Sequence, residues 1–255
     1  MTAIAQASSH RRPAGPVSHA ALKQCVDAVG AAADGVLDAL ATMAAAMVDA
    51  WDVGERPFTI ADIAALQPHI FEQLDRQPWF DSAGYVMSEP ALADQPRHLE
   101  WWRRDQRYSY LPLVLTVEPG APDCYDYYTM EWFVAALNEQ RRFASGPKID
   151  LPCADVYIIT FSYPVIAGGE VLGVAAADVA LSRYESQVRP PLQRIAAPTV
   201  LLNGERRVIT SNDPAWTTGE KFRELPVVAN PEWQAVESVT DELGWILAVG
   251  CAPQP

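Results

Sequence analysis

Apolar residues recur at every third or fourth position from Ser18 to Trp51, which is the spacing of one buried helix face. Ser18 suits an N-cap and Gly54 a stop, so the pattern predicts one long helix over residues 18–54. The apolar stripe is narrow and flanked by alanine, so it suits packing on its own domain or partly on a second copy of the chain. A homodimer through this helix is therefore one of two alternatives. Residues 1–17, rich in Ser, Ala and Pro, are expected to be a disordered leader.

Helical and extended segments alternate in the next part of the chain. Thr59 and Asp62 have the arrangement of a capping box at the start of a second helix, which we expect to kink or break at Pro68. The segment from Tyr125 to Asn138 is predicted to be a loop that enters a helix, with Trp132 turned inward. Strands are predicted at Gly84–Met87, Leu99–Arg104, Tyr108–Val117, Val156–Ile166 and Val171–Leu181. A Gly168-Gly169 turn joins the last two, so the pattern indicates an antiparallel sheet with a helical cover.

A smaller unit is predicted after Arg189-Pro190-Pro191, which has the composition of a linker. Asn203-Gly204 is the strongest short-range hairpin signal in the chain. The elements of this unit are predicted at Thr199–Leu202, Arg207–Ser211, a helix or loop from Ala215 to Trp233, and Gly244–Gly250. Together these patterns predict an α+β protein with a long helix over 18–54, a first module over 55–187 and a reduced second module over 190–252.

Composition narrows the range of functions. The 255 residues are 49% hydrophobic, which is enough for a sizeable core. The net charge of -13 argues against a nucleic-acid partner, because phosphate binding needs a basic face. No run approaches the roughly 18 apolar residues of a membrane span, and the N-terminus lacks the apolar core of a secretory signal. These two absences predict a cytoplasmic protein without membrane contact.

Catalytic and metal-binding patterns are missing from the sequence. The cysteines are widely spaced, and the histidines form neither an HxH nor an HExxH pattern. No GxSxG elbow, P-loop or GxGxxG motif is present. We therefore expect no metal, no cofactor and no catalytic residue, and a binding protein rather than an enzyme.

The order of the elements and a set of motif residues resemble the Cache family of PAS-like (PDC) sensor domains. The order is a long helix, a helical segment, antiparallel strands, an aromatic loop-helix, two long strands and a hairpin-led second module. The motif residues are Trp132-Phe133, Pro164, Gly168-Gly169, Gly173-Val174 and Asp178. The resemblance, to a double Cache sensor with a reduced second module, implies that a ligand lies in the first module, between the sheet and the loop-helix that covers it.

Amino-acid sensors of this family place an Arg two residues before a Trp-Tyr pair, a Tyr after the next turn and an Asp at the end of the last strand. The resemblance implies that the Arg holds the ligand carboxylate, while the rings and the Asp hold its ammonium group. The matching positions here are Met130, Trp132-Phe133, Lys148 and Asp178. The Trp and the Asp are kept, but Met replaces the Arg and both Tyr hydroxyls are missing. The standard carboxylate clamp of these sensors is therefore not expected.

Two binding chemistries stay open. In the first, Trp101, Tyr128 and Trp132 form an aromatic box for an amine, with Asp178 or Asp155 as the counter-charge. In the second, Lys148 or Arg103 binds a carboxylate from a different side of the pocket. Lys148 beside Asp178 would equally make a structural ion pair. The candidate ligand-binding residues are Trp101, Arg103, Tyr110, Tyr128, Trp132, Lys148, Asp155, Tyr157 and Asp178.

The sequence thus predicts a sensor module that captures a small polar metabolite, namely an amino acid, an amine or a short organic acid. Ligand would order the segment from Tyr125 to Asn138 over the sheet and bias a two-state arrangement. The signal would then pass to a separate, unidentified output protein. Two alternatives remain, an enzyme on a PAS-like scaffold and a structural dimerisation module without a ligand.

Overall fold

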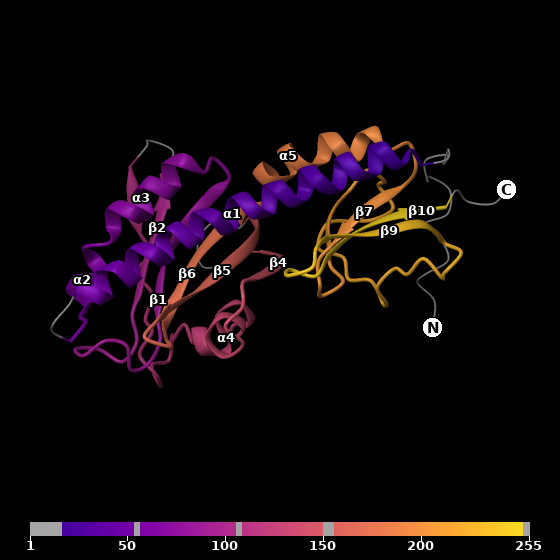
Figure 1. The fold of residues 1–255 in the computed structure, drawn as a ribbon. Coiled ribbons are helices and arrows are strands. Elements are labelled where there is room, and N and C mark those ends of the chain that lie inside the picture. Colours follow the sequence, from indigo (N-terminus) through magenta and orange to yellow (C-terminus); the bar gives the residue numbers. More distant parts are fainter. Residues whose placement is uncertain (1–16, 54–56, 106–108, 150–155, 252–255) are drawn as a thin grey trace. The chain divides into compact units, whose positions relative to one another are not determined.

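The computed structural model describes residues 17–53, 57–105, 109–149 and 156–251 (Figure 1). The chain divides into two compact units. The six-stranded unit consists of Gly35–Ser145 and Ile149–Ala180, and the four-stranded unit of the chain up to Asp34, Gly146–Lys148 and the chain from Leu181 onward. The predicted α+β class is confirmed, with a long helix followed by a larger and a smaller sheet. The predicted module limits, 55–187 and 190–252, stay a prediction.

The long helix α1 (His19–Val53) agrees with the predicted helix and contributes residues to both units. Its apolar stripe is buried within the chain, from Leu22 to Ala33 in the four-stranded unit and from Val36 to Met47 in the six-stranded unit. In the six-stranded unit, the Tyr85 hydroxyl donates a hydrogen bond of 2.9 Å to the carbonyl oxygen of Met43. The first of the two sequence alternatives therefore holds for this stripe, which packs on its own chain.

The same helix corrects one expectation about membranes. The stretch His19–Asp52 of α1 is long and apolar enough to cross a membrane by length and composition. Half of its most apolar window is buried inside the protein, however, and the core helix of a soluble protein passes the same test. The prediction that no run approaches the length of a span was wrong, because the many alanines that flank the apolar stripe raise the hydropathy of the whole helix.

Two short helices lead into the first sheet. The predicted capping box is present at the start of α2 (Ile60–Ala64), where the Asp62 carboxylate accepts a hydrogen bond of 2.9 Å from the Thr59 amide. The predicted break occurs just before Pro68, which lies in the first turn of α3 (Gln67–Arg76). A proline is tolerated there because its missing N–H would have no partner within the helix.

The six-stranded sheet has the strand order β3-β2-β1-β6-β5-β4. The strands are β1 (Phe80–Met87), β2 (Leu99–Arg104), β3 (Tyr110–Pro112), β4 (Phe143–Ile149), β5 (Tyr157–Ala167) and β6 (Glu170–Ala180). The central pairs β2–β1, β1–β6 and β6–β5 are antiparallel. The aromatic loop-helix predicted over 125–138 consists of a 3-10 turn η1 (Tyr127–Thr129) and the helix α4 (Glu131–Asn138).

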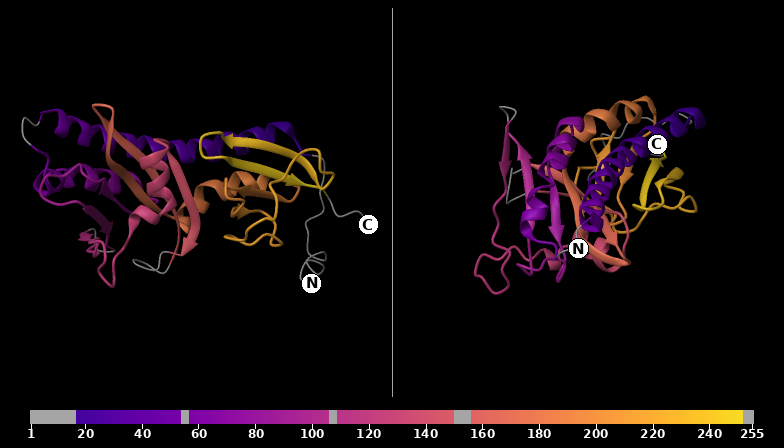
Figure 2. Two further views of the ribbon diagram at one scale, coloured as in Figure 1. Left: turned by 90° about the horizontal axis from the view of Figure 1, so that it is seen from below. Right: turned by 60° about the vertical axis from the view of Figure 1, so that its left-hand side comes forward.

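The two faces of this sheet have different covers (Figures 1 and 2). Side chains alternate along a strand, so Tyr85 and Trp102 lie on one face and Gly84 and Trp101 on the other. The first face is covered by α1 and α3, since the Trp102 ring meets the Phe71 ring edge-on at 5.0 Å between centroids. The second face is covered by α4 and the segment before it. The sheet therefore presents only one face to the loop-helix.

The four-stranded unit contains α5 (Leu181–Arg194) and a sheet in the order β8-β7-β10-β9. Its strands are β7 (Thr199–Leu202), β8 (Val208–Ser211), β9 (Trp233–Thr240) and β10 (Trp245–Gly250). The hairpin around Asn203-Gly204 and the last strand are confirmed. The predicted linker is instead the end of α5, which continues through Pro190 and Pro191. Burial of the apolar face that includes Tyr184, Val188 and Leu192 outweighs the hydrogen bonds that the prolines remove.

Candidate functional site

Two rows of side chains cross the central strands on the face that α4 covers. Each row takes one residue from β2, β1, β6 and β5, and the registers of the three strand pairs fix which residues are neighbours. The first row is Trp101, Gly84, Ala176 and Ser162, and the second is Arg103, Ser82, Asp178 and Thr160. The first row is mostly apolar, while every residue of the second carries a polar or charged group. A ligand between this face and α4 would meet both rows.

Asp178 is the centre of the second row and is held by hydroxyl groups on both sides. Thr160 Oγ1 donates a hydrogen bond of 2.7 Å to Asp178 Oδ1, and Ser82 Oγ donates one of 2.9 Å to Oδ2. The residue is only 8% exposed. Both donors are neutral hydroxyl groups, so these two hydrogen bonds orient the carboxylate without adding a positive charge. The arrangement suits a buried cation, such as a ligand ammonium group.

Arg103 stands at the other end of the second row. Its Nη2 lies 3.8 Å from Oδ2 of Asp81, a separation at the long limit of an ion pair. Asp81 lies where the register of β1 shifts between Phe80 and Ser82. A bulge of this kind re-aims a side chain, which here turns a second carboxylate toward the arginine. The Arg103 side chain is about one third exposed, so it lies at the border of the site.

The apolar row is built around two tryptophans from different elements. The rings of Trp101 on β2 and Trp132 on α4 are 6.5 Å apart and tilted by 45°. The main chain of α4 is attached to the sheet, because Ser162 Oγ donates a hydrogen bond of 2.8 Å to the carbonyl oxygen of Trp132. Gly84 leaves room for Trp101, since a Cβ at that glycine would lie 2.9 Å from Cε3 of the indole. The aromatic surface and Asp178 thus lie on adjacent rows of one face.

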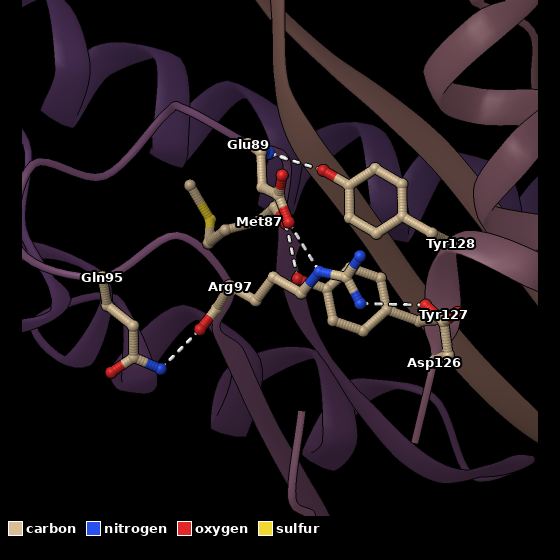
Figure 3. Close-up of polar contacts among 7 residues, drawn as sticks. All are labelled: Met87, Glu89, Gln95, Arg97, Asp126, Tyr127 and Tyr128. Atoms are coloured by element: carbon tan, nitrogen blue, oxygen red, sulfur yellow. Dashed lines mark hydrogen bonds and ion pairs between the residues drawn. The ribbon is translucent and has the colours of Figure 1, made fainter. Parts of the chain in front are cut away.

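An ion-pair cluster that sequence reasoning missed lies around Arg97, between the end of β1 and η1 (Figure 3). Arg97 Nε is 2.6 Å from Glu89 Oε1, and its Nη1 is 2.9 Å from Asp126 Oδ1. The guanidinium carbon lies 4.5 Å from the centroid of the Tyr128 ring. The Tyr128 hydroxyl accepts a hydrogen bond of 2.6 Å from the Glu89 amide. The cluster connects the β1–β2 segment to the segment that leads into α4.

Burial and charge in this cluster shift the pKa values of its groups. The hydrogen bond to Glu89 raises the pKa of Arg97, so the guanidinium group stays charged. Burial raises the pKa of both Tyr127 and Tyr128, and the Tyr127 hydroxyl donates a hydrogen bond of 2.9 Å to the carbonyl oxygen of Met87. Both phenols are therefore neutral at physiological pH. The cluster fixes the entry to α4 and does not supply a reactive group.

The structure brings together four of the predicted site residues and separates others. Trp101, Arg103, Trp132 and Asp178 share the α4 face. Tyr128 lies in the Arg97 cluster, where its ring also contacts Phe133 at 4.9 Å. It therefore supports α4 from the segment before it.

The remaining predicted site residues lie elsewhere. Tyr110 pairs with Arg104 on the α3 face and stacks on Phe71 at 4.0 Å, so it lies apart from the two rows. Tyr157 is exposed and shares the α1 face with Phe161, and the binding roles of both tyrosines stay predictions. Alternation along a strand gives two faces but does not say which one meets α4. Lys148 is half-buried on β4, in the segment that groups with the four-stranded unit, and Asp155 lies outside the described residues.

Comparison with known proteins places these observations in a family context. Residues 67–185 match the family model described as "Methyl-accepting chemotaxis protein-like, first PDC sensor domain". A comparison with curated proteins gave no match. Within the described residues, no group of three His, Cys, Asp or Glu side chains is placed to hold a metal ion. The matched segment contains both rows, α4 and the Arg97 cluster.

Solved structures with the same fold cover nearly the whole chain. Methyl-accepting chemotaxis protein X has a TM-score of 0.67 at 11% identity and covers 92% of this chain and 96% of its own. The ligand-binding domain of the Pseudomonas aeruginosa PAO1 amino acid chemoreceptor PctC, in complex with GABA, has a TM-score of 0.55 at 16% identity, with 91% and 99% covered. The Campylobacter jejuni chemoreceptor Tlp3 sensory domain has a TM-score of 0.56 at 12% identity, with 90% and 91% covered. At these identities the likeness shows the fold alone.

Proposed function

We propose that the chain, whose residues 67–185 match the family model of a first PDC sensor domain, captures a small polar metabolite that carries an ammonium group. The observation that carries the proposal is the buried carboxylate of Asp178, held at both oxygens by hydroxyl donors beside the Trp101–Trp132 pair. A ligand ammonium group beside this carboxylate would gain an electrostatic attraction that shielding from water strengthens. The family is one of sensor domains, in line with the prediction that the chain is not an enzyme.

The aromatic row favours the same kind of ligand. A cation near the face of a tryptophan gains about 2 kcal/mol when it is shielded from water. Trp132 comes from α4 and Asp178 from β6, so a cation that contacts both would connect the sheet to its cover. This contact supports the proposed mechanism, in which ligand stabilises α4 over the sheet. The equilibrium can shift only by as much as the ligand prefers the covered state.

An amino acid fits the polar row better than a simple amine. Arg103 on β2 and Asp178 on β6 are separated by β1 alone, so their backbones are roughly 10 Å apart at the usual spacing of strands. β1 contributes only Gly84 and Ser82 to the space between them. A ligand with an ammonium group at one end and a carboxylate at the other would bridge the two charges. The ligands named for PctC and Tlp3, GABA, isoleucine and valine, have this chemistry.

Thermal denaturation in the presence of candidate compounds tests the proposal. Amino acids, simple amines and short organic acids are compared, with Asp178→Asn as the site variant and Asp49→Asn, on the exposed side of α1, as the matched control. We expect a few amino acids to raise the melting temperature, with stabilisation of about 2.7 kcal/mol at 100 times the dissociation constant. Asp178→Asn should remove this response and Asp49→Asn should keep it. An equal response in both variants would reject the site, and no response in the wild-type protein would reject the function.

The output of the sensor is proposed to lie in a partner protein. The relatives named above are chemoreceptors, and another neighbour is named as the extracellular domain of the histidine kinase soHK1S-Z6 (TM-score 0.56, 16% identity, 90% of this chain and 91% of that chain covered). That name and the apolar length of α1 give no support to the predicted cytoplasmic location. Affinity capture with and without an amino acid that stabilises the protein would identify a ligand-dependent partner.

The predicted homodimer through α1 would have to use the outer side of the helix. The apolar stripe is already buried, and the outer side carries Asp27, Asp34, Asp38 and Asp49. These carboxylates would repel one another in a parallel pair, so the dimer should be favoured by salt. Light scattering after size-exclusion chromatography at low and high ionic strength measures the mass. A monomer in both conditions would rule out the dimer.

A further inference from the structure

The indole N–H of Trp101 is a buried donor without a partner. Trp101 is only 5% exposed, and its Nε1 makes no hydrogen bond within the part of the chain that the structure describes. The next residue is a useful contrast, because Trp102 Nε1, on the opposite face of β2, donates a hydrogen bond of 2.6 Å to Glu100 Oε1. Of these two adjacent tryptophans, the one whose indole N–H lacks a partner lies on the α4 face.

An unpaired buried N–H needs an explanation. Water would satisfy it in the unfolded chain, so folding loses that hydrogen bond without replacing it. Tryptophan has only this one polar group, which donates and cannot accept. A phenylalanine would fill much of the same apolar space without the penalty. The indole is therefore expected to meet an acceptor in some state of the protein.

The surroundings of Trp101 show where such an acceptor would come from. The ring lies over Gly84 and is packed among apolar side chains, including Trp132, Val86 and Val174. The nearest polar residue of its row, Ser162, uses its hydroxyl hydrogen on the carbonyl oxygen of Trp132. The protein surface around the indole thus consists mainly of carbon. This cluster lies between the sheet and α4, where the ligand is proposed to bind.

We propose that Trp101 Nε1 donates a hydrogen bond to the carboxylate of the ligand and thereby selects amino acids over the corresponding amines. The inference rests on the proposed function and deepens it. Trp101 and Arg103 are two residues apart on β2 and point to the same face, so both would contact the carboxylate end of the ligand. Asp178 on β6 would contact the ammonium end of the ligand. The indole thus supplies a donor for the carboxylate from β2.

Binding of matched pairs of compounds tests this inference. L-valine and GABA are compared with isobutylamine and n-propylamine, which lack only the carboxylate. In isothermal calorimetry, Trp101→Phe should weaken the amino acids about tenfold and leave the amines unchanged, because phenylalanine keeps an aromatic side chain but lacks the N–H donor. Trp102→Phe is the matched control and should leave all four affinities unchanged. Equal weakening of the amino acid and its amine would overturn the inference.

Nuclear magnetic resonance gives a second test that does not depend on how the variant folds. The indole resonance of Trp101 is assigned in the wild-type protein, and L-valine or GABA is then added. A downfield shift of the Nε1 proton is expected when the hydrogen bond forms. A bound amino acid with no shift would overturn the inference and leave the proposed function intact. If none of the four compounds binds, the inference and the proposed function are both overturned.

Discussion

Thr160 Oγ1 donates a hydrogen bond of 2.7 Å to Oδ1 of Asp178 across the β5–β6 pair, in a position where the carboxylate is almost fully buried. The bond orients the charge that the proposed ligand would meet. A hydrogen bond to a charged group contributes about 1.5–3 kcal/mol, and most of that is lost when the donor alone is removed.

Thr160→Val should therefore lower the free energy of unfolding by about 2 kcal/mol, because the shape is kept while a buried carboxylate loses a donor. Urea denaturation measures the change. Thr42→Val on α1 is the control, since the Thr42 hydroxyl bonds an exposed helix carbonyl oxygen and its removal should change stability by less than about 0.5 kcal/mol. Similar losses of unfolding free energy in the two variants would show that the hydrogen bond to Asp178 contributes no more to stability than an exposed one.

Gly84 should not tolerate any side chain. A Cβ there would lie 2.1 Å from the carbonyl oxygen of Glu100 and 2.8 Å from Cα of Trp101, both of which are backbone atoms of β2. Gly84→Ala should destabilise the protein by about 3 kcal/mol or separate β2 from β1. Gly35→Ala on α1, where nothing lies within 4 Å, should instead stabilise by up to about 1 kcal/mol. Two thermal unfolding curves decide the matter, and a mild effect at Gly84 would contradict the close approach of β2.

The elements that the sequence predicted well are those whose signal is local. The long helix, the capping box at Thr59 and the Asn203-Gly204 hairpin each depend on residues a few positions apart. Strand β4 was missed because it contains Gly146-Pro147, which has the composition of a turn. Strand β9 was missed because half of its side chains are polar and none of them is fully buried. In both strands, pairing with a neighbour outweighs local preference.

The candidate site was predictable only in part, for a different reason. Trp132 and Asp178 were found through motif positions, but the hydroxyl donors of Asp178 come from β1 and β5 and are brought together by register. Arg97 was missed because its partners are 8 and 29 residues away along the chain, a separation without periodic signal. Contacts between segments far apart in the chain thus required the structure.

The Arg97 cluster should control how firmly α4 is held. Arg97→Met keeps the side-chain stem but removes two ion pairs and the cation over Tyr128, so we expect a loss of about 1–2 kcal/mol after allowance for the exposed carboxylates. Amide hydrogen exchange in residues 127–138 should accelerate. Arg141→Met is a close control, since Arg141 also pairs with a carboxylate and lies 4.6 Å from the Phe143 ring centroid but is far more exposed. Equal exchange in both variants would show that the cluster does not anchor α4.

Glu100 gives the α1 and α3 face of the sheet a dependence on pH. Burial raises the pKa of the Glu100 carboxyl group. Hydrogen bonds with His98, Trp102 and Gln67 together lower the pKa by more than burial raises it, so the net pKa lies below its ordinary value of 4.5. The folded state therefore favours the ionised form. The stabilisation is fully present above the ordinary pKa and is lost as pH falls through the lowered one.

Glu100→Gln should remove this dependence. We expect the variant to be less stable than the wild-type protein at pH 7. The difference in stability should shrink steadily at pH values below the ordinary pKa, because the wild-type carboxyl group then becomes protonated and is neutral like the glutamine amide. Urea denaturation at a series of pH values measures it. Glu72→Gln serves as the control, because Glu72 makes only an exposed ion pair with Arg76, and its curve should stay parallel to that of the wild-type protein. A stability difference for Glu100→Gln that is constant across pH would show that the ionised carboxylate is not what the hydrogen bonds stabilise.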